Sequence, residues 1–466
     1  MEQNSSVSVN ELENNMFIKE PILKLIMKFS IPCVISMVVD ALYNIVDQIF
    51  IGNKVGYLGN ATTNVAFPLV TLVIGVSLLI GNGCSAKFSL DLGNNDKEAV
   101  KKDVGNAIIL SIIVGIVMSV ISFVFLKSLL YAFGATEVIM DHAVRYTSII
   151  IIGQPFLVLS TVLSSIIRAD GKPEFSMFIM IVGAVLNIVL DALFVLKLDM
   201  NVEGAAIATV IGQVISTIMG LSYLKKFQNI KFTAKDLKLE SKVCKTICAL
   251  GASGFITQVS VMLLQIVMNN SVKYYGAMSQ FGSEIPLSAL GIVMKVNQLL
   301  LAIIIGISIG MQPILGFNYG ARRYDRVKST YVVSTLVATF VSTVSFLMFM
   351  LIPGLIIRIF GQEQALYNEF AVMCFRIFLC GSFLIGFQLI SSTYFQATGK
   401  ALKASLLSLS RQAIFIIPLM IILPRFFGIE GVLYSGPIAE VLAAIITAYY
   451  AIKELKVLNN KISSMK

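Results

Sequence analysis

The stretch VEGAAIATVIGQV at residues 202–214 returns as IEGVLYSGPIAEV at residues 429–441, an offset of 227 residues. Three further pairs keep nearly the same offset: GNNDKEAVK (93–101) with GARRYDRVK (320–328), ADGK (169–172) with ATGK (397–400), and FGA (133–135) with FGQ (360–362). Self-similarity at a fixed spacing indicates that one structural unit is repeated. The sequence therefore predicts two halves of similar fold.

The composition places both halves in a membrane. Of the 466 residues, 57% are hydrophobic and 13% are charged, whereas a soluble domain carries about 25% charged residues. The mean hydropathy is +0.85. Apolar runs of about 20 residues, long enough to cross a bilayer as a helix, recur along the chain. These runs are continuously apolar rather than alternating, which favours helices over a barrel.

Twelve spans account for these runs, six in each half. We place them at residues 29–51, 62–86, 105–131, 143–166, 175–197, 204–224, 246–270, 287–315, 329–353, 367–395, 404–423 and 429–452. The predicted fold is an all-α integral membrane protein with twelve transmembrane helices in two pseudo-symmetric six-helix bundles.

The basic residues predict the orientation of the chain. Twenty-six Lys and Arg lie in the N-terminal segment, the even-numbered loops and the C-terminal tail, and six lie in the odd-numbered loops or in the last turn of the span before them. Basic loops stay on the cytoplasmic side, so we expect both termini in the cytoplasm and the protein in the plasma (inner) membrane. The same distribution explains the net charge of +10 as contacts to anionic lipid, which argues against nucleic acid as a partner.

The domain organisation follows from the repeat. We expect a cytoplasmic N-terminal segment (1–28), an N-terminal lobe (29–224), a linker with seven lysines (225–245), a C-terminal lobe (246–452) and a cytoplasmic tail (453–466). An even number of spans gives both lobes the same topology, so their pseudo-symmetry axis runs along the membrane normal and a binding site falls at their interface. This duplication favours an alternating-access transporter over a channel or a receptor.

Two carboxylates stand out in the first span, VVDALYNIVDQIFIG (38–52). Asp40 and Asp47 are seven residues apart, so they share one face of a helix at a separation of roughly 10 Å. Tyr43 and Asn44 fall between them on that face. Acidic residues within a membrane span are costly and usually face a water-filled cavity. The alternative is a structural pair that bonds only to neighbouring helices.

The fifth and sixth spans supply matching groups. Asn187 and Asp191 are four residues apart and share a face, and Asp191 and Thr209 lie at equal distances from the turn near residue 200. Equal distance from a turn means equal depth in an antiparallel pair. We therefore expect Asp47, Asn187, Asp191 and Thr209 to converge in the outer half of the N-terminal lobe. An all-oxygen set suits Na⁺. It also suits a proton, because two close carboxylates do not both ionise readily in a poorly solvated site.

The C-terminal lobe carries a different set of polar residues. Gln258, Gln265 and Asn269 form an uncharged stripe in the seventh span, and we regard them with Asp40, Tyr43 and Asn44 as candidates for lining the cavity. Later spans contain the cations Lys295, Arg376 and Arg411 and the carboxylate Glu440. Glu440 is a candidate partner for one of these cations, and lining the cavity is its alternative role.

Other chemistries find little support. The six cysteines fit neither a disulfide framework nor a zinc site, and His142 is the only histidine. GNGCSA (81–86) matches a dinucleotide motif but follows no strand, and the GK pairs at 171–172 and 399–400 lack the rest of a P-loop. The polar, acidic start of the chain is not a signal peptide. We predict no enzymatic activity, no cofactor and no metal other than Na⁺.

Taken together, these stretches resemble the MATE (multidrug and toxic compound extrusion) family, within a superfamily that also includes lipid and polysaccharide flippases. The resemblance covers nearly the whole chain and rests on YNIVDQIFIG (43–52), NIVLDALFV (187–195), VEGAAIATVIGQV (202–214), RADGKP (168–173) and QATGKA (396–401). It implies two lobes in a V shape and export of mostly cationic, amphipathic drugs, as a monomer, in exchange for Na⁺ or H⁺.

The resemblance also implies roles for individual residues. Asp47 matches the family's carboxylate in the first span, and Asn187, Asp191 and Thr209 match residues proposed to bind the ion with it. Some members instead place a glutamate in the seventh span. Gln258 lies near that position here, which argues against an acidic site in the C-terminal lobe. Asp40 lies outside the motif.

Three functions follow from this sequence. The first is a multidrug efflux transporter driven by Na⁺ or H⁺, with membrane lipids as its surroundings. The second is a flippase of the same fold, which the cations Lys295, Arg376 and Arg411 would favour. The third is a non-transporting receptor or membrane scaffold, for which Asp47 would be dispensable.

Overall fold

The computed structural model describes residues 15–55, 57–282, 284–359 and 365–464, and within these ranges it contains helices and turns but no strand. The side chains of a few helical residues, Asn44 among them, lie outside this description. Residues 1–14 of the predicted N-terminal segment and the FGQ stretch at 360–362 lie outside it as well.

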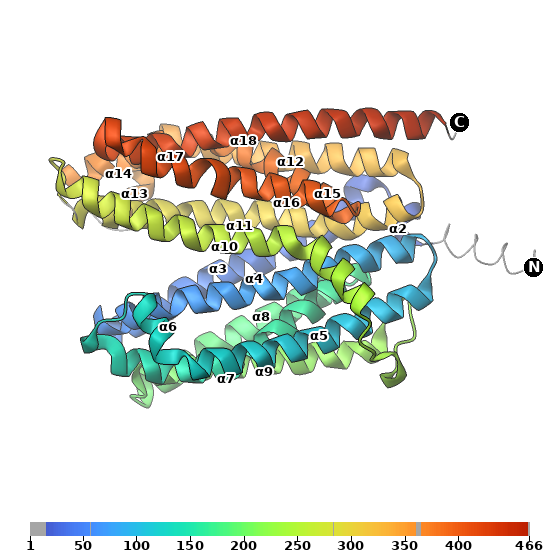
Figure 1. The fold of residues 1–466 in the computed structure, drawn as a ribbon, viewed down its shortest axis with the longest axis horizontal. Coiled ribbons are helices and arrows are strands. Elements are labelled where there is room, and N and C mark those ends of the chain that lie inside the picture. The colour runs from blue at the N-terminus through green and yellow to red at the C-terminus, as the bar shows by residue number, and fades with distance from the viewer. Residues whose placement is uncertain (1–14, 56, 283, 360–364, 465–466) are drawn as a thin grey trace, which may run out of the picture.

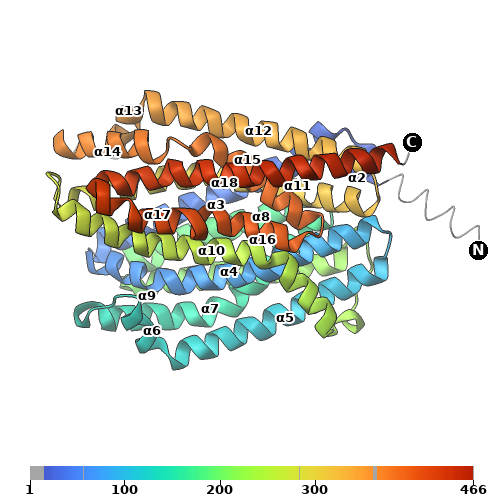
Figure 2. The same ribbon diagram turned by 45° about the horizontal axis from the view of Figure 1, so that its top comes forward.

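The helices form two bundles that lie side by side (Figures 1 and 2). The first bundle, blue to green in Figure 1, contains the helices of the N-terminal half. These are α2 (Met16–Lys19), α3 (Ile22–Val55), α4 (Tyr57–Gly93), α5 (Lys97–Val124), α6 (Leu126–Ala132), α7 (Glu137–Ala169), α8 (Pro173–Asp191), η1 (Ala192–Lys197) and α9 (Asn201–Tyr223).

The short helices η2 (Leu224–Lys226) and η3 (Ala234–Asp236) lie in the connection to the second bundle, which is yellow-green to red in Figure 1. Its helices are α10 (Ser241–Ala277), α11 (Glu284–Gly320), α12 (Tyr324–Leu351), α13 (Pro353–Ile359), α14 (Ala365–Phe378), η4 (Ser382–Leu384), α15 (Ile385–Ala397), α16 (Ala401–Leu409), η5 (Ser410–Ile416), α17 (Ile417–Ile422) and α18 (Pro424–Ser463).

The number of spans agrees with the prediction. Eleven helices in the described part of the chain are long and apolar enough to cross a membrane, and a twelfth span is the bent pair Ala365–Phe378 and Ser382–Ala397. The two parts of this pair meet at 40°. The predicted span at 367–395 thus consists of two helices joined by a bend. Gly381 lies at this bend, and a methyl group there would lie 2.8 Å from Cβ of Glu440 in the neighbouring helix α18, so the two segments pack closely.

The repeat is visible at the turns that follow α7 and α15. ADGK and ATGK each place a glycine with positive φ just beyond the helix, Gly171 at +97° and Gly399 at +79°. Glycine adopts this left-handed conformation without steric cost and so ends a helix. One sequence signal thus produces the same helix end in both bundles.

The predicted linker overlaps the start of helix α10. The prediction placed it at 225–245, whereas α9 ends at Tyr223 and α10 begins at Ser241. Polar residues at the start of α10 concealed its first turn, because apolar content marks the membrane-embedded part of a helix and not its end.

Both ends of the described chain lie at the same end of the molecule, on the right in Figure 1, together with the linker. We call this the terminal end and the opposite end the distal end. The turn between α4 and α5 and the turn between α11 and α12 also lie at the terminal end, because each follows the second span of its bundle.

The two bundles touch closely in the half of the molecule near the terminal end. There α4 packs along α10, and α3 packs along α11. A methyl group on Gly251 of α10 would lie 1.7 Å from the carbonyl oxygen of Leu79 in α4, and one on Gly310 of α11 would lie 2.6 Å from Cα of Ser30 in α3. Only glycine allows backbones to approach this closely.

The distal half of the interface is more open. The face of α4 that carries Leu78 and Asn82 contacts Gly254 of α10. Asn64 and Phe67 lie within about 40–60° of that face, further toward the distal end, yet both side chains are exposed. The two bundles therefore meet near the terminal end and leave this face of α4 accessible near the distal end.

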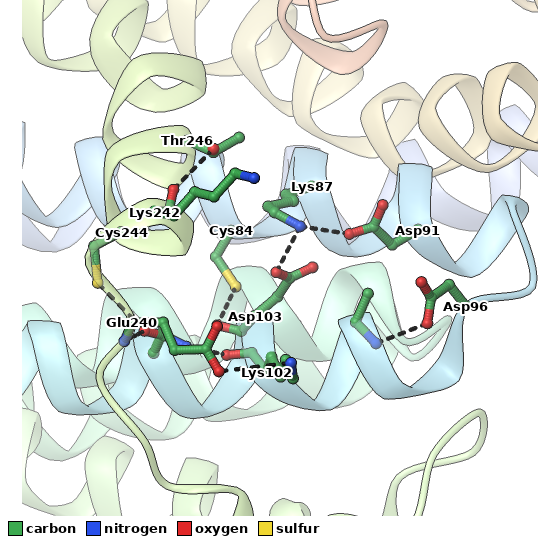
Figure 3. A network of polar contacts seen from close by, with 12 residues as sticks. Cys84, Lys87, Asp91, Asp96, Lys102, Asp103, Glu240, Lys242, Cys244 and Thr246 are labelled. Atoms are coloured by element: carbon green, nitrogen blue, oxygen red, sulfur yellow. Dashed lines mark hydrogen bonds and ion pairs between the residues drawn. The ribbon is translucent and has the colours of Figure 1, made fainter.

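A polar network stabilises the terminal end of the first bundle (Figure 3). Lys87 of α4 donates to Asp91 at 2.5 Å and pairs with Asp103 of α5 at 2.8 Å, and Asp103 is fully buried. The backbone N–H of Glu240, just before α10, donates to Oδ1 of Asn106 at 2.5 Å. The network thus ties α4, α5 and the start of the second bundle together.

Candidate functional site

Two carboxyl groups meet inside the first bundle. Asp47 is carried by α3, and Asp191 is the last residue of α8. Their side chains lie within hydrogen-bonding reach of each other. Asp191 is completely buried. A facing pair of buried carboxyl groups needs a cation or a shared proton between them, because two bare negative charges repel strongly in a poorly solvated site.

An amide and a hydroxyl complete the group. The side-chain amide of Asn187 in α8 forms favourable hydrogen bonds when its nitrogen donates to Oδ2 of Asp191 at 3.2 Å. Its oxygen then accepts from the backbone N–H of Thr209 in α9 at 3.1 Å and from the hydroxyl of Thr209 at 3.2 Å. The structure thus brings together all four residues that the sequence placed at one depth.

The site retains free coordinating capacity. One oxygen of Asp47 and one oxygen of Asp191 are buried without a hydrogen-bond partner among the described residues. Buried carboxylate oxygens without partners are costly, and a hard cation or a proton would satisfy them. Among the described residues, no group of three or more His, Cys, Asp or Glu side chains is arranged to hold a metal ion.

The helix changes its geometry directly after Asp191. Residues Ala192–Lys197 form the π-helical turn η1, and single π-helical turns occur frequently at functional sites. The second bundle also has a π-helical segment in its fifth span, η5. The sequence analysis predicted neither segment.

Sequence reasoning also missed Tyr146. This residue of α7 is buried and lies within electrostatic range of Asp47, Asp191 and Tyr43. Tyr146 therefore belongs to the surroundings of the two carboxyl groups. Its span carries several other polar residues, such as Thr147 and Gln154, so no signal in the sequence singled it out.

The other candidates on α3 lie near this group. Tyr43 is half-buried and within electrostatic range of Asp40 and Asp47. Asp40 is exposed, although it lies deep among protein atoms. Asn44 belongs to α3, and its side chain is outside the described part of the structure.

The stripe predicted on the seventh span lies apart from the acidic group. Gln258 is half-buried, and Gln265 and Asn269 are exposed, all on α10 in the second bundle. They share one face of that helix, since seven and eleven residues bring the chain back to about the same side. The structure does not bring them to Asp47.

Glu440 does have a cationic partner, as the sequence suggested. Nη1 of Arg411 in η5 lies 3.9 Å from Oε1 of Glu440 in α18. The side chain of Gln388 in α15 donates to Oε2 of Glu440 at 2.9 Å. Glu440 is thus held by two helices of its own bundle, which supports the structural interpretation.

The two remaining cations are unpaired. Lys295 of α11 and Arg376 of α14 are both exposed. Neither forms an ion pair with any residue that the structure describes.

The fold and this buried polar group define a class of protein: a polytopic helical membrane protein built from two six-span bundles. The family model MatE matches residues 32–193 and 255–422, one segment in each bundle. The chain therefore belongs to the MatE family of membrane transporters, and it is a transporter and not an enzyme.

Known relatives agree with this assignment. The chain is 26% identical over 434 residues to the multidrug export protein MepA of Staphylococcus aureus strain N315, covering 92% of this chain and 93% of the relative. It is 24% identical to MepA of Staphylococcus saprophyticus with the same coverage.

Solved structures share the fold. One is described as the outward-facing conformation of a multidrug resistance MATE family transporter of the MOP superfamily, with a TM-score of 0.88, 24% identity and coverage of 96% of this chain and 98% of that chain. A MOP superfamily transporter from Pyrococcus furiosus, described as having a binding pocket of reverse polarity, has a TM-score of 0.88 at 23% identity, covering 95% of this chain and 98% of the other.

Proposed function

We propose that this protein exports cationic, amphipathic compounds across the plasma (inner) membrane in exchange for Na⁺ or H⁺. The observation that carries the proposal is the pair Asp47 and Asp191, each of which has one buried oxygen without a hydrogen-bond partner in the part of the chain that the structure describes. The relatives named as multidrug export proteins support the choice of substrate.

The proposed mechanism uses alternating access between the two bundles. The terminal end faces the cytoplasm, in accord with the basic residues there, and the distal end faces outward. In the outward-facing state a cation from outside binds Asp47 and Asp191, with Asn187 and Thr209 orienting the carboxyl groups. Neutralising the acidic pair weakens the attraction for a cationic compound, which leaves toward the outside.

The lobes of this mechanism are residues 29–224 and 246–452, working as a monomer. Segment 225–245 connects them, and its last residues belong to the first turn of α10. Close glycine contacts near the terminal end hold the lobes together in the outward-facing state. Opening toward the cytoplasm requires these contacts to separate.

Efflux from proteoliposomes tests the proposal. A fluorescent lipophilic cation is loaded, and a Na⁺ gradient and then a pH gradient are imposed on wild type and on Asp47→Asn. We expect one gradient to drive transport and the variant to abolish it. Asp141→Asn is the matched control, because Asp141 is exposed, pairs with Arg145 and is not one of the four residues of the site. Failure of both gradients in correctly inserted wild type would overturn the proposal.

A specific observation favours the flippase as a second candidate. Lys295 and Arg376 are exposed cations in the spans, and such cations suit an anionic lipid head group. Dithionite quenching of a fluorescent anionic lipid in the same proteoliposomes would detect flipping. The third function considered from the sequence, a non-transporting receptor or scaffold, does not agree with membership of a transporter family.

A further inference from the structure

The connection between the two bundles is fastened to the first bundle at both ends. We call residues 228–240 of this connection the strap. Near its start, Asn229 donates to Oδ1 of Asp170, just beyond α7, through its backbone N–H at 3.2 Å and its side chain at 3.0 Å. At its end, the backbone N–H of Glu240 donates to Asn106 of α5. The strap is therefore an ordered part of the first bundle and not a loose tether.

The strap lies at the level where α5 leaves the hydrocarbon region of a membrane. The backbone oxygen of Asp236 packs so closely on Gly105 of α5 that a methyl group there would collide with it. The first accessible apolar side chain of α5 beyond Gly105 is Ile109, four residues or about 6 Å toward the distal end. The head-group layer of a bilayer is roughly 5–7 Å thick on each side of the hydrocarbon core. The strap is therefore level with the lipid head groups.

Two leucines of the strap are left uncovered by the protein. Leu237 is 40% exposed and Leu239 is 52% exposed. Segments that lie along a membrane surface place such apolar side chains at the boundary between head groups and acyl chains. At the level of the strap, this boundary is within reach of a leucine side chain.

Three lysines alternate with or flank these leucines. Lys235, Lys238 and Lys242 are all exposed, and none forms an ion pair with any residue that the structure describes. The two carboxylates of the strap are engaged within the protein. Asp236 accepts from the backbone N–H and the hydroxyl of Thr233, and Glu240 pairs with a lysine of α5. The three ammonium groups therefore remain available to an anion from outside the chain.

We propose that the strap is a binding site for anionic lipid in the leaflet at the terminal end. Leu237 and Leu239 enter the boundary between head groups and acyl chains, and the lysines reach the charged head groups along their flexible stems. A negatively charged leaflet attracts ammonium groups near its surface. Because the strap is ordered without lipid, little conformational freedom is lost on binding. This site goes beyond the proposed function, since it requires neither the coupling ion nor the exported compound.

Tryptophan fluorescence tests the site directly. The chain contains no tryptophan, so Leu239→Trp places a single fluorophore in the strap. The full-length variant is reconstituted in phosphatidylcholine with a small fraction of brominated lipid, which quenches tryptophan on contact. Brominated phosphatidylglycerol and brominated phosphatidylcholine are compared at the same fraction. We expect phosphatidylglycerol to bind beside the tryptophan at least about fivefold more strongly, the effect of a single lysine near an anionic surface.

Two further tryptophans provide comparison sites. Leu237→Trp repeats the measurement at a second position of the strap and should give the same preference. Phe340→Trp lies in the middle of α12, at a side chain that is 70% exposed. It reports the lipid-facing surface of a span and should be quenched equally by the two lipids.

Matched lysine variants assign the preference to the strap. In the Leu239→Trp protein, replacing Lys235, Lys238 and Lys242 together by glutamine should bring the ratio of the two binding constants close to one. Lys453→Gln/Lys456→Gln removes two exposed lysines of α18 in the second bundle and should leave the ratio unchanged.

The outcomes separate this inference from the proposed function. If neither lipid quenches the strap tryptophans, the strap lies away from the membrane, and if both lipids quench them equally, the contact has no preference for charge. Either result overturns the inference. An equal loss of preference in the α18 variant would assign it to the general surface charge and would overturn the site as well. Ion-driven efflux is measured separately, so each of these results leaves the proposed function standing.

Discussion

Thr209 shows how a residue without charge contributes to an ion site. Its hydroxyl and N–H both face the amide oxygen of Asn187, and this turns the amide nitrogen toward Asp191. The hydroxyl therefore acts on the carboxyl pair through the amide. Removing the hydroxyl leaves Asp47 and Asp191 in place, but the amide of Asn187 that orients Asp191 is then less firmly held.

We predict that Thr209→Val lowers the apparent affinity for the driving ion roughly three- to tenfold, since one hydrogen bond is worth about 1 kcal/mol. The maximal rate should change little. The measurement is the initial efflux rate at increasing ion concentration. Thr217→Val is the control, because Thr217 is on the same helix and bonds only to the backbone carbonyls of Phe156 and Gln213. Equal effects of both variants would contradict this assignment.

We expect the ion pair between Arg411 and Glu440 to stabilise the second bundle. We predict that Glu440→Gln lowers the free energy of unfolding by roughly 1–3 kcal/mol, because the partly buried guanidinium loses its counter-charge. Ion-driven efflux per folded molecule should remain. Thermal unfolding of purified protein checks the first part, and a double variant Arg411→Met/Glu440→Leu should recover part of the loss. A variant that folds normally but loses its ion dependence would show that Glu440 acts in coupling.

Sequence and structure differ at this scale for a physical reason. The depth of a residue follows from counting along an antiparallel pair, which is why Asp47, Asn187, Asp191 and Thr209 were predicted together. The rotation of each helix about its axis does not follow from counting. For this reason the choice of Arg411 over Lys295 and Arg376 as partner of Glu440 required the structure, as did Tyr146.

At the scale of elements, apolar content predicted the spans but not their irregularities. The bend near Gly381 and the π-helical turns η1 and η5 interrupt spans that are apolar throughout, so hydropathy alone did not predict them. The same applies to Lys87 and Asp103. The prediction treated both as loop residues, whereas they pair inside the extended ends of α4 and α5.

The contact between α4 and α10 gives a prediction about this pair of elements. We expect Gly251→Ala to force the helices apart, because the added methyl group would lie 1.7 Å from the carbonyl oxygen of Leu79. The terminal half of the interface should then open more often. Gly291→Ala is the control, since no atom lies within 4 Å of a methyl group at that position.

A cysteine at Ser89 reports the opening of this interface. Ser89 is buried, and its Cβ would lie 2.7 Å from a methyl group on Gly316 of the second bundle. In a background without the native cysteines, maleimide should label Ser89→Cys slowly, and Gly251→Ala should raise that rate several-fold. An unchanged rate would mean that the two helices can absorb the methyl group without separating.

At the scale of the whole molecule, the segment before α3 joins the two bundles at the terminal end. Phe17 is buried, and its ring centroid lies 5.3 Å from that of Phe29 in the first bundle and 5.0 Å from that of Phe317 in the second. The guanidinium of Arg326 in α12 donates to the backbone oxygens of Phe17 at 3.2 Å and of Glu20 at 2.6 Å. The same few residues therefore pack and hydrogen-bond across the interface.

The segments that precede the two bundles make different contacts. Phe17 packs against both bundles, whereas the linker leads into α10. The linker contacts the first bundle, where the backbone N–H of Glu240 donates to Asn106. The N-terminal segment instead contacts both bundles at their interface. The internal repeat of the sequence does not predict this difference between the two segments.

We predict that Arg326→Ala loosens the terminal half of the molecule without disturbing either bundle. The variant loses two hydrogen bonds to backbone oxygens, and bonds of this kind with a charged donor contribute about 1.5–3 kcal/mol each. Labelling of Ser89→Cys should therefore be faster in this variant. Phe17→Ala should also make it faster, because it removes the aromatic ring that packs against both bundles. Arg323→Ala is the control, because Arg323 is exposed and its side chain makes no cap bond at the start of α12. If Arg326→Ala and Arg323→Ala label at the wild-type rate, the contact packs the N-terminal segment without holding the two bundles together.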